Sequence, residues 1–450
     1  MGPQRHGAAI RDNPVMIELK RRVRGRWPRG EFGRAVTTLV LGTGASQAIV
    51  IATSPVLTRL YSPVDYGVFA VAGSIVSVLA TVTCLRYEYA LPLPKDDIAG
   101  ANVLALSLLI NGAMSLAAAL ILWLLAPTLL PIFGATALIP FVWVISIGQF
   151  GGGIVSALTN WAVRTKSFGE IAATRLTQGL ALVTVQIGLG LTGAGSVGLI
   201  VGDTAGRIAG STRLARVAWK THRLAFRQVS RAGILAGASR YRRFPIYSMP
   251  SALLATFATQ TPLLLMIVAY GPEAGGYFAL AARICAIPLT LIANAVGHVF
   301  VAQSATLMQE DPAALKGLFK RTTMSLAKTA TIPAVLGMIA APLFSGLVFG
   351  SDWAPAGTFV AILIPSYLLQ FVIAATGDVL YVVERQDLQV VREILRFTLL
   401  GLAVPVAAWL GLPAIQAIVL LSAAGILNYA LYGLITWKAI SIRSVRPAAR

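Results

Sequence analysis

The sequence predicts an all-α, polytopic membrane protein of about twelve transmembrane helices arranged in two six-helix lobes. Three observations predict this class: the composition, the positions of the basic residues, and a repeat that relates the two halves of the chain. Of 450 residues, 56% are hydrophobic and only 12% are charged, whereas soluble domains carry about 25% charged residues. Because so few polar side chains cannot cover a surface that faces water, we expect lipid to be the solvent.

Twelve apolar segments are predicted to cross the membrane. Each is roughly 16–28 residues long, and a hydrocarbon core of about 30 Å needs roughly 20 residues at 1.5 Å per residue. The predicted spans are 36–57, 67–85, 103–126, 138–160, 173–192, 195–212, 246–270, 277–304, 327–349, 357–383, 396–411 and 413–436.

Basic residues lie almost entirely on one side of these spans. If the gaps alternate between inside and outside, the inside gaps hold 32 of the 37 Lys and Arg residues when Arg396, the first residue of the eleventh span, is counted with the gap before it, and the outside gaps hold only Arg59. This positive-inside bias predicts an even number of spans and cytoplasmic termini. The formal charge of +20 is therefore attributed to topology, and nucleic acid is not an expected partner.

The chain divides into five predicted regions. Residues 1–35 carry nine basic side chains, and so does the linker between the sixth and seventh spans. The stretch 15–24 is interpreted as a surface segment attracted to anionic membrane lipids; a solvated tail is the alternative. The regions are a basic cytoplasmic N-terminal segment (1–35), an N-lobe (36–212), a basic cytoplasmic linker (213–245), a C-lobe (246–436) and a cytoplasmic C-terminal tail (437–450).

Two matches across the linker indicate that the lobes are copies of one unit. The segment 61–70 recurs as 270–279, with Tyr, Pro, Gly, Phe and Ala in register at an offset of 209. A second match, at an offset of 221, pairs Gln149-Phe150, Arg164 and Arg175 with Gln370-Phe371, Arg385 and Arg396. Since each unit has six spans, the two are parallel repeats, an arrangement that some secondary transporters use.

The repeated Tyr-x-Pro…Gly-x-Phe motif is interpreted as structural. Pro and Gly are expected to shape a tight turn, while the aromatic side chains anchor at the outer membrane interface. Direct contact with a substrate is the alternative.

Enzymatic chemistry has no support in the sequence. Gly188, Gly190 and Gly193 match the spacing of a dinucleotide fingerprint, but they end an apolar span with no preceding strand. There is no P-loop, no His-Glu-x-x-His and no nucleophile–base arrangement, and the two cysteines, Cys84 and Cys285, lie in apolar runs. We therefore expect no catalytic residues, no metal site and no cofactor.

The candidate site residues are charges at membrane depth. A charge near the centre of a spanning helix costs about 2.5–3.5 kcal/mol, so it usually faces a cavity or a partner. Because most of these charges are basic, and Arg offers a fork of donors to phosphate oxygens, they favour a phosphate-bearing ligand over a drug cation. The candidates for contact with a diphosphate in the lumen are Arg283, Arg207, Arg175 and Arg86.

Coupling to an ion gradient would need a titratable or ion-binding group at similar depth. The candidates are Asp203, Asp378, Glu88 and His298, with H⁺ or Na⁺ as the driving ion. Asp203 and Arg207 lie one turn apart and are expected to pair. Snorkelling to the headgroups is the alternative for the basic residues and for Asp378, and a solvated helix end is the alternative for Arg86 and Glu88.

Several of these stretches resemble Wzx-type polysaccharide flippases. They are 61–70, Leu85-Arg-Tyr-Glu, Leu93-Pro-Lys-Asp-Asp, Tyr241-Arg-Arg-Phe-Pro-Ile-Tyr and Ala279-Leu-Ala-Ala-Arg. These flippases form the polysaccharide-transport branch of the multidrug/oligosaccharidyl-lipid/polysaccharide (MOP) exporter superfamily. The resemblance runs from about residue 36 to residue 436.

The resemblance implies a location in the inner membrane of a bacterium and a V-shaped, MATE-like fold that opens alternately to the two sides. The implied substrate is an undecaprenyl-diphosphate-linked oligosaccharide for O-antigen or exopolysaccharide, turned from the cytoplasmic to the periplasmic leaflet, and polysaccharide-assembly proteins are possible partners. Two alternatives stay open. One is a multidrug exporter of the same superfamily, and the other is a membrane-embedded polysaccharide polymerase or ligase, which typically has a large periplasmic loop.

Overall fold

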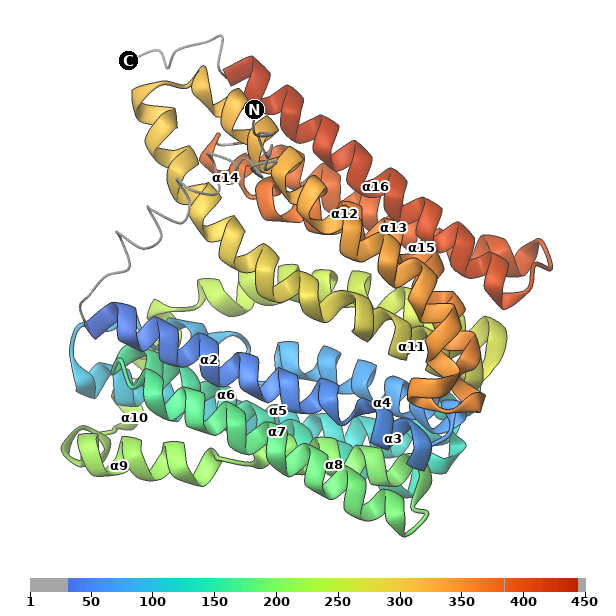
Figure 1. Ribbon diagram of the computed structural model, residues 1–450. Helices are drawn as coiled ribbons and strands as arrows, with labels where there is room; N and C mark the ends of the chain where they lie inside the picture. The colour runs from blue at the N-terminus through green and yellow to red at the C-terminus, as the bar shows by residue number, and fades with distance from the viewer. Residues whose placement is uncertain (1–30, 384, 444–450) are drawn as a thin grey trace, which may run out of the picture.

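The protein folds into helices alone in the part of the chain that the structure, a computed structural model, describes, which is residues 31–383 and 385–443. Figure 1 shows two groups of long helices that meet at one end and diverge at the other. The predicted all-α, two-lobe membrane class is confirmed. The predictions for residues 1–30 and 444–450 concern segments outside the described residues.

The N-lobe holds the first six long helical segments and the linker helices. Its elements are α2 (Glu31–Ala52), α3 (Ser54–Leu60), α4 (Pro63–Val82), η1 (Tyr87–Ala90), α5 (Asp97–Ile132), η2 (Thr136–Phe141), α6 (Val142–Arg164), α7 (Phe168–Leu191), α8 (Gly195–Ile208), α9 (Ser211–Arg227) and α10 (Arg231–Arg240).

The C-lobe follows a short π-helical segment, η3 (Phe244–Ser248). Its elements are α11 (Met249–Glu310), α12 (Ala314–Phe349), η4 (Ser351–Trp353), α13 (Ala354–Gly377), α14 (Val379–Val382), α15 (Gln386–Trp409) and α16 (Ala414–Arg443).

Eight segments of the described chain are long and apolar enough to cross a membrane by length and composition. The other four predicted spans correspond to α7, α8, the second half of α11, and α15. Of these, α8 has only 14 residues, so it is about 21 Å long at 1.5 Å per residue and shorter than a hydrocarbon core.

The seventh and eighth predicted spans form one long helix with a bend. The bend lies at Gly271, where φ is +86°, a conformation that glycine adopts without steric cost. Pro272 follows and starts the second half, because a proline is tolerated in the first turn of a helix. The predicted six-residue gap between these spans is therefore a single hinge point.

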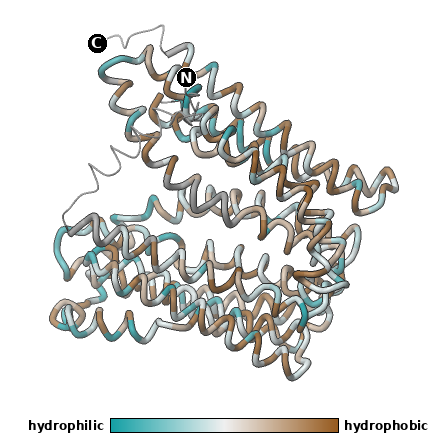
Figure 2. Tube along the Cα trace, in the orientation of Figure 1, coloured by the Kyte–Doolittle hydropathy of each residue, from teal (hydrophilic) through white to brown (hydrophobic). Residues whose placement is uncertain are grey.

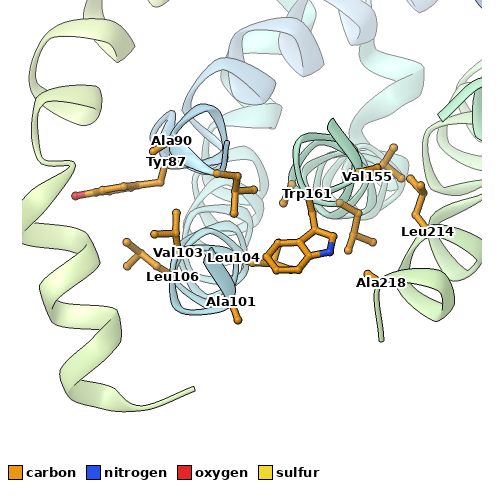
Figure 3. Packing of buried hydrophobic residues seen from close by; sticks show 14 of the residues in the cluster. Tyr87, Ala90, Ala101, Val103, Leu104, Leu106, Val155, Trp161, Leu214 and Ala218 are labelled. Atoms are coloured by element: carbon orange, nitrogen blue, oxygen red, sulfur yellow. The ribbon is translucent and has the colours of Figure 1, made fainter. Parts of the chain in front are cut away.

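The predicted linker is helical and belongs to the N-lobe. Leu214 and Ala218 of α9 are buried in one cluster with Val155 and Trp161 of α6, and Figure 3 shows their side chains facing one another. Helix α10 is tied to the same lobe, because the Tyr87 hydroxyl donates to the carbonyl of Ala238 at 3.1 Å. The linker thus moves with the N-lobe, and the chain crosses to the C-lobe only after α10.

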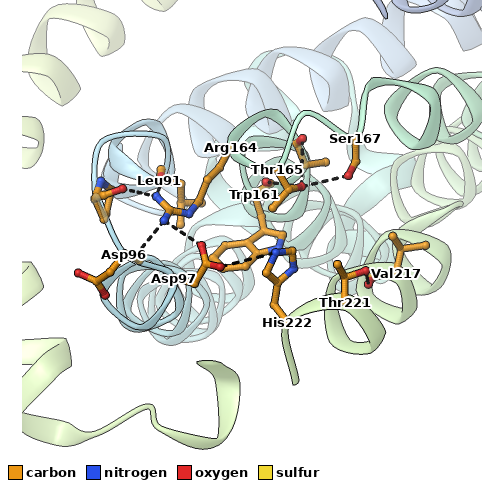
Figure 4. Close-up of polar contacts among 12 residues, drawn as sticks. Leu91, Asp96, Asp97, Trp161, Arg164, Thr165, Ser167, Val217, Thr221 and His222 are labelled. Carbon is orange, nitrogen blue, oxygen red and sulfur yellow. Dashed lines mark hydrogen bonds and ion pairs between the residues drawn. The ribbon is translucent and has the colours of Figure 1, made fainter. Parts of the chain in front are cut away.

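A polar network holds the 91–97 segment against α6 and α9, as Figure 4 shows. The Arg164 guanidinium donates to the carbonyl of Asp96 at 2.8 Å and pairs with the Asp97 carboxylate at 3.1 Å. His222 of α9 lies 3.9 Å from the other oxygen of Asp97. Arg164, which the second sequence match singled out, therefore has a structural role in this lobe.

We call the two ends of the molecule the closed end and the linker end. At the closed end, α3, α4 and the bend of α11 lie together; at the linker end, α9 and α10 lie beside the N-lobe and the lobes diverge (Figure 1). Figure 2 shows hydrophilic residues gathered along α9 and α10, while most of the long helices are hydrophobic.

The structural interpretation of the repeated motif needs correction. Tyr61 is 2% exposed and its hydroxyl donates to the carbonyl of Gln186 at 2.6 Å, so it does not anchor at a lipid interface. Gly67 and Gly276 lie inside helices and not in turns. Pro63 does begin a helix, after a capping box made by Ser62.

Candidate functional site

A polar cavity of about 300 Å³ opens inside the N-lobe near its linker end. Its walls come from the end of α4, the turn that follows, α6 and the last turn of α8. Three of the predicted site residues, Arg86, Glu88 and Arg207, line it together. Cys84 and Tyr89 line it as well, and Gly152, where a Cβ atom would meet nothing within 4 Å, leaves room on the α6 wall.

The turn that carries Arg86 has an unusual backbone. Leu85 and Arg86 are consecutive non-glycine residues with positive φ, at 49° and 67°. Such a conformation costs roughly 1–3 kcal/mol per residue and persists only where the surroundings enforce it. It ends α4 abruptly and turns residues 86–89 back to the cavity wall.

Arg86 has unused hydrogen-bonding capacity. Its guanidinium lies 4.8 Å from the centre of the Tyr89 ring, a cation–π contact. Its Nε is buried and has no hydrogen-bond partner in the described chain. A buried donor without a partner costs free energy, so a rearrangement of the side chain that gives this Nε an acceptor, such as a ligand oxygen, would be favoured.

Glu88 is buried beside Arg86, which excludes the alternative of a solvated helix end for its carboxyl group. Its residue is 4% exposed, and its Oε2 has no hydrogen-bond partner among the described residues. Burial raises the pKa of the Glu88 carboxyl above its ordinary value, while a backbone hydrogen bond and the charge of Arg86 oppose the rise. The group is thus placed to change its protonation state nearer to neutral pH than an exposed glutamate.

Arg207 pairs with Asp203, as the sequence predicted. Its Nε lies 2.6 Å from Asp203 Oδ2, one helical turn away in α8. Both side chains are partly buried, and Arg207 reaches the cavity.

Gln149 is a cavity residue that the sequence analysis did not select. It is 2% exposed, and its Nε2 donates to the carbonyl of Leu79 at 2.9 Å. That bond joins α6 to α4 across the cavity wall. Its place in the second repeat match was the only signal in the sequence.

The other candidates lie elsewhere. Arg283, in the second half of α11, is half-buried near Tyr66 of α4, with which it interacts electrostatically. Arg175 is exposed on α7 and donates to Gln178 at 3.1 Å. Asp378 is exposed between α13 and α14, and the side chain of His298 lies outside the described part of the structure.

A second charged cluster lies in the C-lobe and was missed because residues 384–395 were assigned to a cytoplasmic gap. Arg392 forms an ion pair with Glu393 and donates to the Tyr432 hydroxyl at 2.9 Å. Arg396 lies 3.6 Å from Glu393 and donates to Thr259 of α11 at 3.3 Å. Both guanidinium groups have protein partners, although the Nε of Arg396, like that of Arg86, is buried and has no hydrogen-bond partner among the described residues.

The N-lobe cavity is suited to binding an oxyanion. It offers two guanidinium groups, which match phosphate oxygens bidentately, and the hydroxyl group of Ser156. Within the described residues, no group of three or more His, Cys, Asp and Glu side chains could hold a metal ion.

Comparison with solved structures places the fold among MOP transporters. An inward-facing multidrug resistance MATE family transporter of the MOP superfamily matches with a TM-score of 0.59 and 16% identity over 91% of this chain and 96% of that one. The lipid II flippase MurJ in an inward closed conformation matches with a TM-score of 0.61 and 12% identity over 90% of each chain. The eukaryotic MATE transporter AtDTX14 matches with a TM-score of 0.52 and 15% identity over 91% and 99%.

Sequence comparison identifies the family. No curated protein sequence matches the chain. The family model described as polysaccharide biosynthesis protein matches residues 56–357, which is more than half of the chain and includes the cavity, the linker helices and the bend of α11. The chain therefore belongs to the polysaccharide biosynthesis protein family.

Proposed function

We propose that the protein is a flippase that moves an undecaprenyl-diphosphate-linked oligosaccharide from the cytoplasmic to the periplasmic leaflet. The observation that carries this proposal is the N-lobe cavity, where Arg86 and Arg207 converge in a chain of the polysaccharide biosynthesis family. A diphosphate is the part of such a lipid that the membrane interior rejects most strongly, so it needs compensating charge inside the protein. The sugar and the polyprenyl chain need no such compensation from charged groups.

The linker end faces the cytoplasm in this proposal. The nine basic residues of the linker lie there, and cytoplasmic segments of membrane proteins are rich in Lys and Arg. The lobes diverge at this end, so the substrate would enter from the cytoplasmic leaflet and leave after the closed end separates.

An ion gradient drives the cycle in this proposal. Glu88 lies beside Arg86, so a proton on the carboxyl group and a phosphate on the guanidinium would influence each other electrostatically. A phosphate that binds Arg207 would break its ion pair with Asp203. The Asp203 carboxylate would then be free to take up a proton or cation, so Asp203 is a second candidate for coupling.

The test is transport in proteoliposomes that contain the purified protein. The probe is a polyprenyl diphosphate linked to one fluorescent sugar, and a membrane-impermeant quencher reports how much label reaches the outer leaflet over time. We expect the protein to accelerate exchange of this probe but not of a fluorescent phosphatidylcholine. No acceleration over empty vesicles, or equal acceleration of both lipids, would overturn the proposal; transport of a cationic drug instead would indicate the exporter alternative.

The proposed orientation predicts the outcome of reporter fusions. Fusions after Arg231 and Arg450 should report a cytoplasmic location, and a fusion after Gly134, at the closed end, should report the periplasm. Alkaline phosphatase and a fluorescent protein serve as complementary reporters. A periplasmic signal at Arg231 would contradict the orientation, because α10 would then lie on the wrong side.

Arg283 is the remaining candidate for substrate contact, and its variants separate three roles. Arg283→Ala should lower transport about tenfold at normal abundance if the guanidinium meets the diphosphate, since one charged hydrogen bond is worth roughly 1.5–3 kcal/mol. Arg283→Lys should then recover only part, because it loses the planar fork. If Arg283→Lys is as active as the wild type, the side chain snorkels to the headgroups. If Arg283→Ala lowers the amount of protein in the membrane together with transport, Arg283 instead holds two helices together. The readout is cytoplasm-facing lipid-linked glycan in flippase-deficient cells, divided by the amount of protein in the membrane.

A further inference from the structure

The two copies of the repeated Tyr-x-Pro…Gly-x-Phe motif lie against each other at the closed end. Pro63 and Gly67 are the positions of the first copy that correspond to Pro272 and Gly276 of the second, at the offset of 209. The first pair opens α4 and the second pair opens the latter half of α11. The two copies of the motif are therefore related in sequence and also contact each other in the folded protein.

The contact between the copies is reciprocal. A Cβ atom placed on Gly67 would lie 1.8 Å from the carbonyl oxygen of Pro272, and a Cβ atom placed on Gly276 would lie 1.9 Å from the carbonyl oxygen of Pro63. Each glycine thus faces the proline of the other copy. Non-bonded carbon and oxygen atoms do not approach that closely, so neither position can carry a side chain unless the two helices move apart.

Other contacts between the lobes surround this one. The Trp353 indole is 1% exposed, donates to the carbonyl of Thr58 at 2.8 Å, and meets the Tyr66 ring edge-on at 4.8 Å. Arg59 donates to the carbonyl of Leu347 at 2.9 Å. These bonds join α3 and α4 of the N-lobe to α12 and η4 of the C-lobe.

The tight approach is confined to the closed end of α4. A Cβ atom on Gly73, two turns further along the same helix, would meet nothing within 4 Å. There α4 contacts the first half of α11 through side chains, as where Gln260 donates to the Ser74 hydroxyl at 3.0 Å. Side chains can rearrange while the helices stay in place, whereas a contact between bare backbones cannot.

We propose that Gly67 and Gly276 are a matched pair of gate residues, and that the missing side chain at both positions is what allows the closed end to seal. A methyl group at either position should hold the α4 and α11 backbones apart and shift the protein toward a state that is open at this end. The inference concerns the conformational equilibrium; only its transport readout rests on the proposed function.

The experiment measures the distance between the lobes at the closed end. Spin labels are attached at Thr192→Cys, in the loop between α7 and α8, and at Gln416→Cys, at the start of α16, in a Cys84→Ala/Cys285→Ala background. Both label sites are exposed. Double electron–electron resonance on the purified protein in lipid nanodiscs then gives the populations of short and long distances.

Gly67→Ala and Gly276→Ala should each lower the ratio of short to long distances at least about tenfold. Gly73→Ala is the matched control, since it makes the same change on the same helix where there is space, and it should leave the ratio unchanged. An unchanged ratio in both gate variants would overturn the proposal, and so would an equal shift in the Gly73→Ala control.

Two further variants keep the test decisive. Because both glycines act on one contact, the Gly67→Ala/Gly276→Ala double variant should shift the ratio by less than the product of the single shifts; a full product would contradict a shared gate. If the alanine variants do not fold, Trp353→Phe removes the bond to Thr58 without adding atoms and should shift the ratio in the same direction. If the glycine variants lose transport but keep the wild-type distance ratio, the gate proposal is wrong, while the proposed flippase function is unaffected.

Discussion

Arg86→Ala should lower transport of the lipid-linked glycan at least about 100-fold while the protein still reaches the membrane. Arg86 supplies the one guanidinium of the cavity that has no acidic hydrogen-bond partner in the described chain, and its Nε is unsatisfied. Two charged hydrogen bonds to a phosphate are worth roughly 3–6 kcal/mol, and about 1.4 kcal/mol corresponds to a factor of ten. Arg86→Lys should recover only part of the activity because an ammonium lacks the planar fork.

The backbone at residue 86 allows a sharper control. Because φ there is 67°, Arg86→Gly removes the side chain and also relieves the strain, whereas Arg86→Ala keeps the strain. If the guanidinium matters for transport, both variants should lose activity alike; recovery in Arg86→Gly alone would show that the turn and not the charge is needed. Arg216→Ala, which removes an exposed charge from α9, should behave as the wild type.

Binding is measured separately with the same variants. The probe is a short-chain polyprenyl diphosphate added to the purified protein in nanodiscs, with thermal stabilisation as the readout, since a ligand that binds the native state raises its stability. We expect stabilisation of the wild type, little of Arg86→Ala, and normal stabilisation of Arg216→Ala. Equal stabilisation of all three would place the diphosphate outside the cavity.

The fold class could be predicted from the sequence because its signals are additive along the chain. Apolar length and basic asymmetry each accumulate over many residues, so errors at single positions do not change the result. The Asp203–Arg207 pair was also predictable, because residues four apart on a helix are neighbours. The helical linker was predictable in principle as well: Leu214, Ala218 and Ala225 recur on one face of α9 and are buried.

The composition of the site could not be predicted in this way. Arg86 lies in the turn after α4 and Arg207 lies in α8. No sequence feature near either residue indicates that they share a cavity, because only the packing of α4, α6 and α8 brings them together. Depth, a charge that suits a diphosphate and a place in a flippase-like stretch also favoured Arg283, which the structure places in the C-lobe, near Tyr66 of α4 and away from the cavity. The turn at residues 85–86 was read as a helix end, since positive φ in two non-glycine residues has no sequence signature.

Glu88→Gln should abolish transport driven by a proton gradient, by about 100-fold, if Glu88 takes up and releases the coupling proton. The amide keeps the shape of the protonated carboxyl group but cannot release a proton, so the cycle should stop in one protonation state. Exchange of labelled substrate without a gradient should persist, which distinguishes lost coupling from lost binding. Exposed Glu310, at the end of α11, provides the matched control Glu310→Gln.

The stability of the protein should report the same group through its pH dependence. Burial raises the pKa of Glu88 in the folded state, so the native state favours the protonated form more than the unfolded chain does. The resulting stabilisation is fully present below the ordinary carboxyl pKa of about 4.3 and is lost as the pH rises through the raised value. Relative to Glu88→Gln, the wild type should therefore lose thermal stability as the pH rises from this ordinary value through the raised pKa of Glu88, and Glu310→Gln should follow the wild type. If the melting temperatures of the wild type and Glu88→Gln change with pH in the same way, the Glu88 carboxyl group does not titrate from a buried site. Asp203 would then be the remaining candidate for proton coupling in the N-lobe.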